Sequence, residues 1–331
     1  MSSRKPKICV VGPGVVGKAT LRAFRDKGLE TAFVARTQDS VSKLRAEGFE
    51  AYGRNDLMNG DYDFDITIFT LPTPTNNKKI NLDAMELAAI DLGKRLRKTN
   101  KYHIVVVKST CPPGTTEDLV VRTIEEFSGK KVGVDFGACM NPEYLREVSA
   151  YEDTVKPWII VIGEYDKKSG DLLASAYKNF DAPIYRCSMK EAEMQKYVHN
   201  LYNAVKITFF NEMREIANSI DADADKIFEY TVKSCEGIWN PKYGTKDRGA
   251  FSGACLPKDT KAFLHFVKSQ GLEADLLKRT IEVNEKIKAN ESAVLAMNHA
   301  DGKATNGNGK TNGHSDLRFI ELAREEEMNT N

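Results

Sequence analysis

The chain has 331 residues, of which 41% are apolar, and its formal net charge is +1. This length allows one large or two ordinary domains, and the apolar fraction excludes a mostly disordered protein. A net charge near zero provides no basic field that would favour nucleic acid or an acidic membrane. Because no stretch approaches 18 apolar residues, we expect no membrane-spanning helix.

Six cysteines are spread along the chain with no CxxC pair and no histidine-rich segment beside them, at positions 9, 111, 139, 187, 235 and 255. This spacing predicts neither a zinc site nor any other metal site, and a chain of this length without a signal peptide does not suggest a disulfide framework. The N-terminal residues lack an apolar core of signal length. We therefore expect a reduced, cytoplasmic protein.

Short β-branched runs alternate with helical patterns in the first half of the chain. The alternation predicts a parallel, doubly wound α/β sheet buried on both faces. The predicted strands are Ile8–Val11, Thr31–Ala35, Asp65–Leu71, His103–Lys108, Val132–Phe136 and Trp158–Gly163, and helices are predicted at Val16–Lys27, Asp83–Arg97 and Thr116–Phe127.

The pattern changes near residue 189. Lys190–Ser219 contains no Gly or Pro, and its apolar residues recur three or four positions apart, which predicts one long helix. Further helices are predicted at Asp223–Ser234, Pro257–Gln270 and Glu273–Lys288. We therefore predict three regions: a dinucleotide-binding domain over 1–188, a mostly helical domain over 189–299, and a low-complexity, disordered tail over 300–331.

A glycine-rich turn follows the first predicted strand and opens a helix. Its sequence is Gly12-Pro13-Gly14-Val15-Val16-Gly17. In this context Gly12 allows the tight turn, Gly14 lets the backbone approach a pyrophosphate, and Gly17 permits close packing of helix on strand. The pattern predicts a Rossmann-type domain that holds the phosphates of NAD at a helix N-terminus, with Val15 and Val16 beside them.

The second predicted strand lacks the acidic residue that NAD sites place at its end. It is followed by Arg36, which suits the 2′-phosphate of NADP. Two interpretations stay open: an arginine that reads the 2′ position, or a solvated arginine with NAD still held by its pyrophosphate.

Five further segments are difficult to explain by packing alone. They are 71–75 (LPTPT), 108–115 (KSTCPPGT), 141–147 (NPEYLRE), 191–200 (EAEMQKYVHN) and 253–260 (GACLPKDT). Together with the glycine turn, and in this order, they resemble the UDP-glucose/GDP-mannose dehydrogenase family over residues 7–290, with its UDP-glucose 6-dehydrogenases as the nearest match.

The resemblance implies an oxidoreductase that converts the C6 alcohol of a nucleotide sugar into a carboxylate in two hydride transfers. It makes Cys255 the nucleophile, which captures the aldehyde as a thiohemiacetal and becomes a thioester before hydrolysis. The local sequence suits this role independently, because Pro257 is a favoured first helical residue and a helix N-terminus favours the thiolate. Lys258 adds a nearby positive charge.

The resemblance also assigns the other candidate site residues. Lys196 and Asn200, four apart on one helix face, would stabilise the developing oxyanion, Asp259 would help to activate water, and Thr110 would position that water. Glu143 would be a base for thioester hydrolysis, whereas His199 is expected at the surface. Pro72, Thr73, Thr110, Glu147 and Lys258 would contact the cofactor, and the substrate would contact Tyr144, Leu145, Arg146, Glu147, Lys196, Asn200, Lys242, Phe251 and Gly253.

The sequence departs from the family pattern in four respects. Ala35 or Arg36 replaces the acid after the second strand, and Ser252 replaces one of two glycines before the cysteine segment. Lys242 replaces an arginine that reaches across the family's dimer, which removes the bidentate fork. The opening motif of the family's third domain, which covers the sugar, has no counterpart in residues 301–331.

These departures keep more than one function open. The first is a nucleotide-sugar 6-dehydrogenase that acts on UDP-glucose or a relative. The second is a catalytically silent dinucleotide-binding or dimerisation protein, and a third is a β-hydroxyacid dehydrogenase, which would not need the cysteine segment. In each case we expect a homodimer built on the helix 190–219, because that helix is apolar on more than one side.

Overall fold

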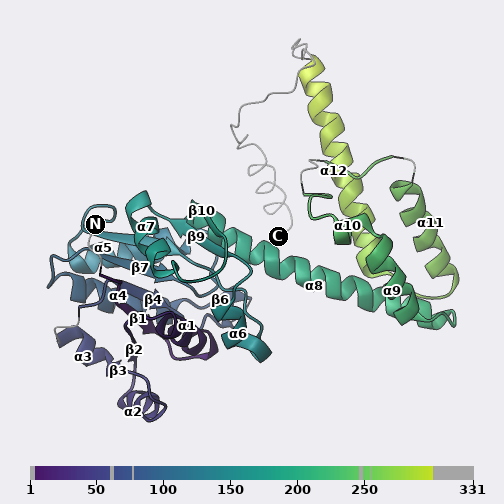
Figure 1. Ribbon diagram of the computed structural model, residues 1–331. Helices are drawn as coiled ribbons and strands as arrows, with labels where there is room; N and C mark the ends of the chain where they lie inside the picture. The colour runs from purple at the N-terminus through teal and green to yellow at the C-terminus, as the bar shows by residue number, and fades with distance from the viewer. Residues whose placement is uncertain (1–3, 60–62, 77, 246–248, 254, 301–331) are drawn as a thin grey trace. The chain divides into compact units, whose positions relative to one another are not determined.

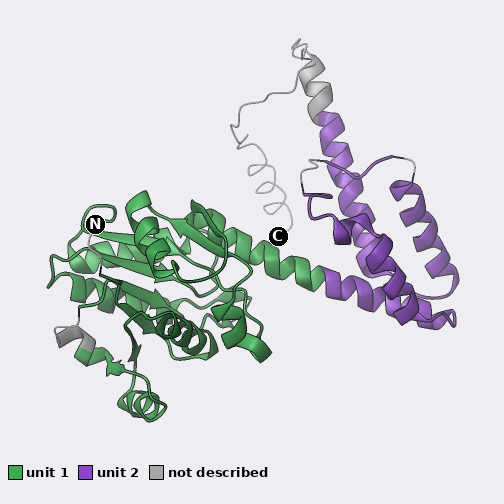
Figure 2. Cartoon of the chain, viewed as in Figure 1, with its two compact units in different colours: residues 1–205 green, residues 206–331 purple. Residues whose placement is uncertain are grey.

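The computed structural model describes residues 4–59, 63–76, 78–245, 249–253 and 255–300. The chain divides into two compact units, residues 1–205 and 206–331 (Figure 2). The predicted tail 300–331 lies almost wholly outside the described residues. We predicted the boundary between the two domains at 188/189, 17 residues before the division at 205/206. The predicted domain bounds stay a prediction.

An eight-stranded sheet forms the centre of the first unit (Figure 1). Its strand order is β10-β9-β8-β7-β4-β1-β2-β3. The strands are β1 (Ile8–Val11), β2 (Thr31–Ala35), β3 (Ala51–Gly53), β4 (Ile66–Phe69), β7 (His103–Val107), β8 (Phe136–Met140), β9 (Ile160–Glu164) and β10 (Ile184–Ser188), and β5 (Thr75–Asn76) pairs with β6 (Lys79–Ile80) in a separate ribbon.

The predicted doubly wound sheet is confirmed, with two corrections. Strand β9 runs antiparallel to β8, so the last two strands oppose the other six, as edge strands of large α/β sheets often do. The strand predicted at Val132–Phe136 is wrong, because that segment is a turn and the strand begins at Phe136. Strands β3 and β10 were not predicted; β3 is only three residues long, and β10 is largely exposed.

Helices cover both faces of the sheet because successive strand residues point to opposite sides. In β7, Ile104 and Val106 join one buried cluster, whereas Val105 and Val107 join the other. The first cluster contains residues of α1 (Val15–Asp26), α2 (Gln38–Ala46) and α7 (Lys167–Ala176), and the second contains residues of α4 (Asp83–Leu96), the π-helical segment η1 (Thr116–Val121) and α5 (Arg122–Ser128).

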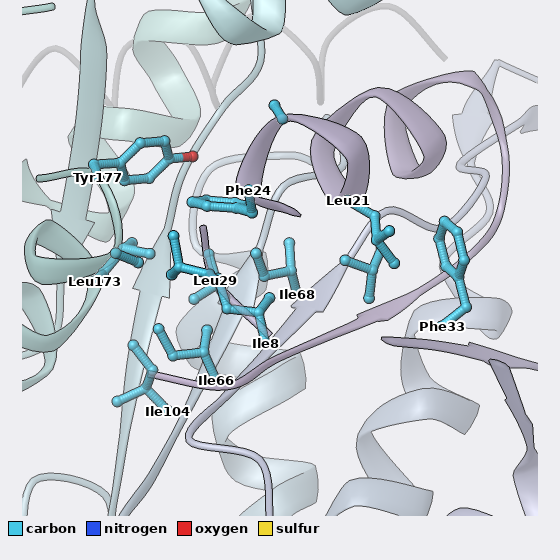
Figure 3. Close-up of a cluster of buried hydrophobic side chains, with 14 of the residues drawn as sticks. Ile8, Leu21, Phe24, Leu29, Phe33, Ile66, Ile68, Ile104, Leu173 and Tyr177 are labelled. Atoms are coloured by element: carbon cyan, nitrogen blue, oxygen red, sulfur yellow. The ribbon is translucent and has the colours of Figure 1, made fainter. Parts of the chain in front are cut away.

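Figure 3 shows part of the first cluster. Phe24 of α1 lies over strand residues such as Ile8 and Ile68, and its ring centroid is 5.0 Å from that of Tyr177, which follows α7. Strands buried on both faces fix the positions of the loops at their carboxyl ends, where sites of such folds lie. The remaining elements of this unit are α3 (Arg54–Asn59), the 3₁₀ turn η2 (Glu147–Ser149) and α6 (Ala150–Val155).

The long helix is confirmed as α8 (Met189–Ser219), which begins in the first unit and ends in the second. The second unit is otherwise helical, as predicted, with α9 (Ala224–Ser234), α10 (Glu236–Trp239), α11 (Leu256–Ser269) and α12 (Asp275–Ala300). Its buried core is small and centres on Ile216, Val267 and Ala274. The Glu212 carboxylate accepts hydrogen bonds from the backbone N–H groups of Leu276 and Leu277, which fixes α8 to the start of α12.

Candidate active site

The glycine turn has the geometry that its sequence predicts. Gly12 has a φ of +108°, which favours glycine, and its carbonyl accepts a hydrogen bond of 2.7 Å from the Thr70 hydroxyl. A side chain at Gly17 would overlap the Gly12 carbonyl and lie 2.8 Å from Thr70 Oγ1, so α1 could not approach the turn so closely. Gly14 is the N-cap of α1, and a side chain there would meet no atom within 4 Å. The open space beside Gly14 is where a pyrophosphate would lie.

A cavity of about 290 Å³ opens beside this turn. It extends from Gly12 and Pro13 to Ala35 and Arg36 at the end of β2, and Pro72 also lines it. Its walls are mostly apolar, as those of a nucleoside pocket are. The turn, the open position at Gly14 and the cavity together fit a dinucleotide.

Two loops are tied together next to the cavity. The Thr73 hydroxyl, in the loop after β4, donates to the Thr110 carbonyl, after β7, at 2.9 Å. Ser109 donates to the Leu71 carbonyl at 2.8 Å. The structure thus brings together the predicted cofactor residues Pro72, Thr73 and Thr110.

A buried ion pair joins α8 to the loop after β8. Lys196 Nζ lies 3.0 Å from Glu143 Oε1 and also donates to the Glu143 carbonyl at 2.5 Å. Only 6% of the Lys196 side chain and 18% of the Glu143 side chain are exposed. The other Glu143 oxygen accepts from the backbone N–H of Leu145 at 2.8 Å. The predicted oxyanion donor and the predicted base are therefore in direct contact.

A second buried lysine lies behind this pair, and the sequence interpretation missed its contribution. Lys108 Nζ, at the end of β7, donates to Asn141 Oδ1 at 2.8 Å, and the Tyr177 hydroxyl donates to the same oxygen at 2.5 Å. Burial lowers the pKa of Lys108 to about 8, with Glu143 raising it and Lys196 lowering it to smaller extents. This network holds the segment that carries Glu143.

Glu193 is the second residue that sequence reasoning missed. It is almost completely buried on α8, and its carboxylate accepts from the backbone N–H groups of Gly114 and Thr116 and from the Thr116 hydroxyl. These bonds fix the segment after Thr110 to the helix that carries Lys196. Both missed residues lie inside quoted motifs. For Lys108 the available signal was a charged residue directly after an apolar strand, whereas Glu193 stands among other charged residues and gave no such signal.

The remaining candidates of this unit lie on α8 and in the segment after β8. The Tyr144 hydroxyl donates to Gln195, and its ring lies 5.0 Å from that of His199 and 5.4 Å from Lys196 Nζ. His199 is half-buried, not fully at the surface, and burial lowers its pKa, with Lys196 lowering it further and Glu143 raising it. The other candidates are exposed: Asn200, Glu147 and Arg146, of which Arg146 pairs with Asp153 at 2.8 Å.

The second unit carries the cysteine segment. Cys255 is exposed at the N-cap position of α11, and its carbonyl accepts from the Asp259 N–H at 2.8 Å. Lys258 Nζ pairs with Asp259 Oδ1 at 2.5 Å, so its charge is shared with that carboxylate. Phe251 donates its N–H to Asn284 Oδ1 at 2.6 Å. Gly253 and Lys242 are exposed in loops.

The other cysteines are poor candidates for the nucleophile. Burial raises the pKa of Cys9, Cys111 and Cys139 to about 12, and it also raises the pKa of Cys187. Cys255 and Cys235 are the two exposed thiols. Exposure and pKa together leave two of the six cysteines as candidates for the nucleophile.

Within the part of the chain described here, no cluster of three or more His, Cys, Asp or Glu residues could hold a metal ion. No described helix is long and apolar enough to cross a membrane.

The glycine turn, its cavity and the polar groups at the carboxyl ends of β4, β7 and β8 define a dinucleotide-binding oxidoreductase. Residues 53–181 match the NAD binding domain of the UDP-glucose/GDP-mannose dehydrogenase family, and residues 190–286 match its central domain. The chain belongs to this family, as its motifs predict.

The chain is similar both to GDP-mannose 6-dehydrogenases and to UDP-glucose 6-dehydrogenases. The GDP-mannose 6-dehydrogenase of Pseudomonas syringae pv. tomato is 34% identical over 98% of the chain and 70% of its own length. The UDP-glucose 6-dehydrogenase of Haloferax volcanii is 33% identical over 84% of the chain and 69% of its own length. A crystal structure of a GDP-mannose dehydrogenase ternary complex from Pseudomonas aeruginosa has a TM-score of 0.81 at 30% identity, and covers 98% of this chain and 79% of the other.

Proposed function

We propose that the chain is an NAD(P)-dependent nucleotide-sugar 6-dehydrogenase that oxidises the C6 alcohol of a nucleotide sugar to a carboxylate. The buried contact between Lys196 and Glu143 carries this proposal. A buried ion pair contributes little net stability by itself, so its position in the loop after β8, at the edge of the sheet where the sites of such folds lie, is better explained by chemistry. Sequence favoured UDP-glucose, whereas relatives of similar identity act on GDP-mannose, so both sugars enter the test.

Each residue has a defined task in the proposed reaction. The turn formed by Gly12, Gly14 and Gly17 would hold the dinucleotide, which would supply the hydride acceptor for both oxidation steps at C6. A base removes the hydroxyl proton in the first step, and the Cys255 thiolate then adds to the aldehyde carbon to give a thiohemiacetal. Lys196 and Asn200 donate to the oxygen on which negative charge develops. Loss of the second hydride leaves a thioester on Cys255.

Hydrolysis completes the reaction. Glu143 accepts a proton from a water that Thr110 positions and Asp259 helps to activate, and the hydroxide adds to the thioester carbon. The carbon–sulfur bond then breaks, releasing the carboxylate and restoring the thiol. For one sugar, two hydrides leave C6 and one water oxygen enters, so two dinucleotides would be needed in turn as hydride acceptors.

The test is incubation of the purified chain with UDP-glucose or GDP-mannose and either NAD or NADP. Formation of reduced nicotinamide is followed by absorbance and the acid product by mass spectrometry. Cys255→Ser is expected to abolish acid formation, because serine is a much weaker nucleophile than a thiolate. Cys235→Ser is the matched control, since Cys235 is also exposed and also an N-cap, and it is expected to keep parental activity.

The alternative is a catalytically silent protein that only binds dinucleotide or dimerises. It predicts dinucleotide binding without reduction of nicotinamide on any of these sugars. A Cys255→Ser variant that still makes acid at the parental rate would contradict the cysteine mechanism.

A cytoplasmic location stays a prediction from the sequence.

A further inference from the structure

The end of β2 has an unusual charge for an NAD site. In dinucleotide-binding folds the residue at this position faces the 2′ position of the adenosine ribose, where an acid accepts from the hydroxyl and an arginine accommodates a 2′-phosphate. Here Ala35 ends the strand and Arg36 follows it, and both line the cavity that contains Gly12. The position that reads the 2′ group is therefore cationic.

The two arginines that line the cavity, Arg36 and Arg54, differ in their hydrogen bonds and ion pairs. Arg54 binds Asp91 through two nitrogens, with Nη2 2.7 Å from Oδ1 and Nε in contact with Oδ2. Within the described part of the chain, Arg36 forms no hydrogen bond or ion pair, and its side chain is exposed. Asp91 is the one acid in the described lining of the cavity, and Arg54 offsets its charge. The unneutralised charge of this lining is therefore that of Arg36.

Further donors stand next to Arg36. Helix α2 begins two residues later, with Thr37 as its N-cap, and the Thr37 and Ser40 hydroxyl oxygens lie 2.9 Å apart. The first backbone N–H groups of a helix are unpaired within it and attract anions. Asp39, in the first turn, pairs with Lys43 at 2.8 Å, so its charge does not stand alone.

We propose that this pocket takes the 2′-phosphorylated dinucleotide, NADP(H), in preference to NAD(H). The Arg36 guanidinium binds the 2′-phosphate, and the Thr37 and Ser40 hydroxyls and the start of α2 complete the site. A 2′-phosphate carries between one and two negative charges, which Arg36 can bind through two parallel hydrogen bonds. This inference rests on the dinucleotide binding of the proposed function, and not on turnover.

The test is equilibrium binding, measured by the fluorescence of NADPH and NADH with the purified chain. We expect NADPH to bind at least about tenfold more tightly, since one charge-assisted hydrogen bond contributes about that factor. The non-redox probe 2′,5′-ADP is expected to displace NADPH at concentrations where 5′-AMP does not. The preference should shrink as salt is raised, because the phosphate contact is exposed.

Variants separate the 2′ contact from general electrostatics. Arg36→Asp is expected to remove the preference while leaving NADH binding at least as tight as in the parent. Arg36→Lys is expected to keep part of the preference, because lysine keeps the charge but loses the fork. Arg97→Asp, at the end of α4 and outside the cavity lining, makes the same charge change and should leave the ratio of affinities unchanged.

Equal affinities in the parent, or a ratio that Arg36→Asp does not move, would overturn this inference. Loss of binding of both dinucleotides in the parent would overturn it together with the proposed function. Tight NADPH binding without oxidation of any nucleotide sugar would support this inference and contradict only the proposed function.

Discussion

The ammonium of Lys196 lies 3.0 Å from Glu143 Oε1, and the two residues come from different elements, α8 and the loop after β8. Both groups are largely shielded from water, so each provides the main counter-charge of the other.

Breaking this pair from one side is expected to destabilise the chain. Lys196→Met or Glu143→Gln should each lower the free energy of unfolding by about 3 kcal/mol, because a buried charge loses its partner. The double variant should recover much of this loss, since neither charge remains. Acid formation from the nucleotide sugar should be lost in all three variants. Urea unfolding measures the change in stability, and product analysis measures the loss of acid formation.

Lys206→Met is the matched control for this cycle, because Lys206 is exposed on the same helix. This substitution should change neither the free energy of unfolding nor the rate of acid formation. If the double variant recovers turnover along with stability, the pair is structural and its proposed catalytic role is wrong.

The glycine turn offers a second pair of contrasting variants. Gly14→Ala should leave the thermal midpoint unchanged, since Gly14 has an ordinary φ of −72° and open space around its Cα. It should weaken dinucleotide binding at least about tenfold, because the added methyl occupies the path of the pyrophosphate. Titration by nicotinamide fluorescence measures this loss.

Gly17→Ala should act in the opposite way. Its methyl would overlap the Gly12 carbonyl, so α1 must move away from the turn, which costs about 1–3 kcal/mol of stability. Equal thermal midpoints for the two variants would contradict this division of roles.

Sequence patterns predicted the parts of the fold that depend on local periodicity. The length of α8 and the positions of β1, β2 and β7 agree with prediction to within one residue. Strand β10 escaped prediction because its residues are mostly exposed and it lacks a clear apolar pattern. The direction of β9 depends on the tertiary crossover, which no local pattern encodes.

In the candidate site, too, local patterns were predicted and contacts between distant residues were not. Motifs identified Lys196 and Glu143, but not that they pair with each other, because 53 residues separate them. The buried support from Lys108 and Glu193 depends on how the strand ends meet α8 in space. Such contacts are non-local, and residue type alone does not reveal them.

His103 is expected to make the stability of the first unit depend on pH. It is buried in β7, with Nδ1 3.0 Å from the Phe64 carbonyl and Nε2 2.9 Å from Thr67 Oγ1. Burial is the largest cause that lowers its pKa from 6.5 to about 4. Between these values the unfolded chain binds a proton that the folded chain does not, so stability falls as pH falls from 6.5 to 4.

The effect of His103 should reach about 2–3 kcal/mol at pH 4.5, because its pKa lies about 2.5 units lower in the folded chain than in the unfolded chain. Urea unfolding followed by circular dichroism at pH 7 and pH 4.5 measures it. His103→Asn should reduce the difference between the two pH values by that amount, whereas His265→Asn, which changes an exposed histidine, should not. An unchanged pH difference in His103→Asn would rule out His103 as its source.

The exposed face of α8 is expected to hold a homodimer together. Five apolar residues at helical spacing are exposed on it, each by 42–57% of its surface: Met194, Val198, Leu201, Val205 and Phe209. Met213 and Ile216 continue the same helical spacing, but they pack into the core of the second unit and are not part of this exposed face. Phe210 also packs internally, 4.9 Å from Phe228 between ring centroids. Apolar surface this extensive on one helix needs a cover, and a second copy in a two-fold arrangement is the commonest one.

Light scattering at low micromolar concentration tests the dimer. The parent should have about twice the chain mass of 37.0 kDa. Leu201→Glu with Val205→Glu should convert it to a monomer, since four buried carboxylates, two from each copy, would face one another at the interface. Val134→Glu, which changes an exposed apolar residue of the first unit, should remain a dimer. A parent of 37 kDa would refute the dimer and with it a role for Lys242 in the partner's site, because that residue could reach another copy only through such an interface.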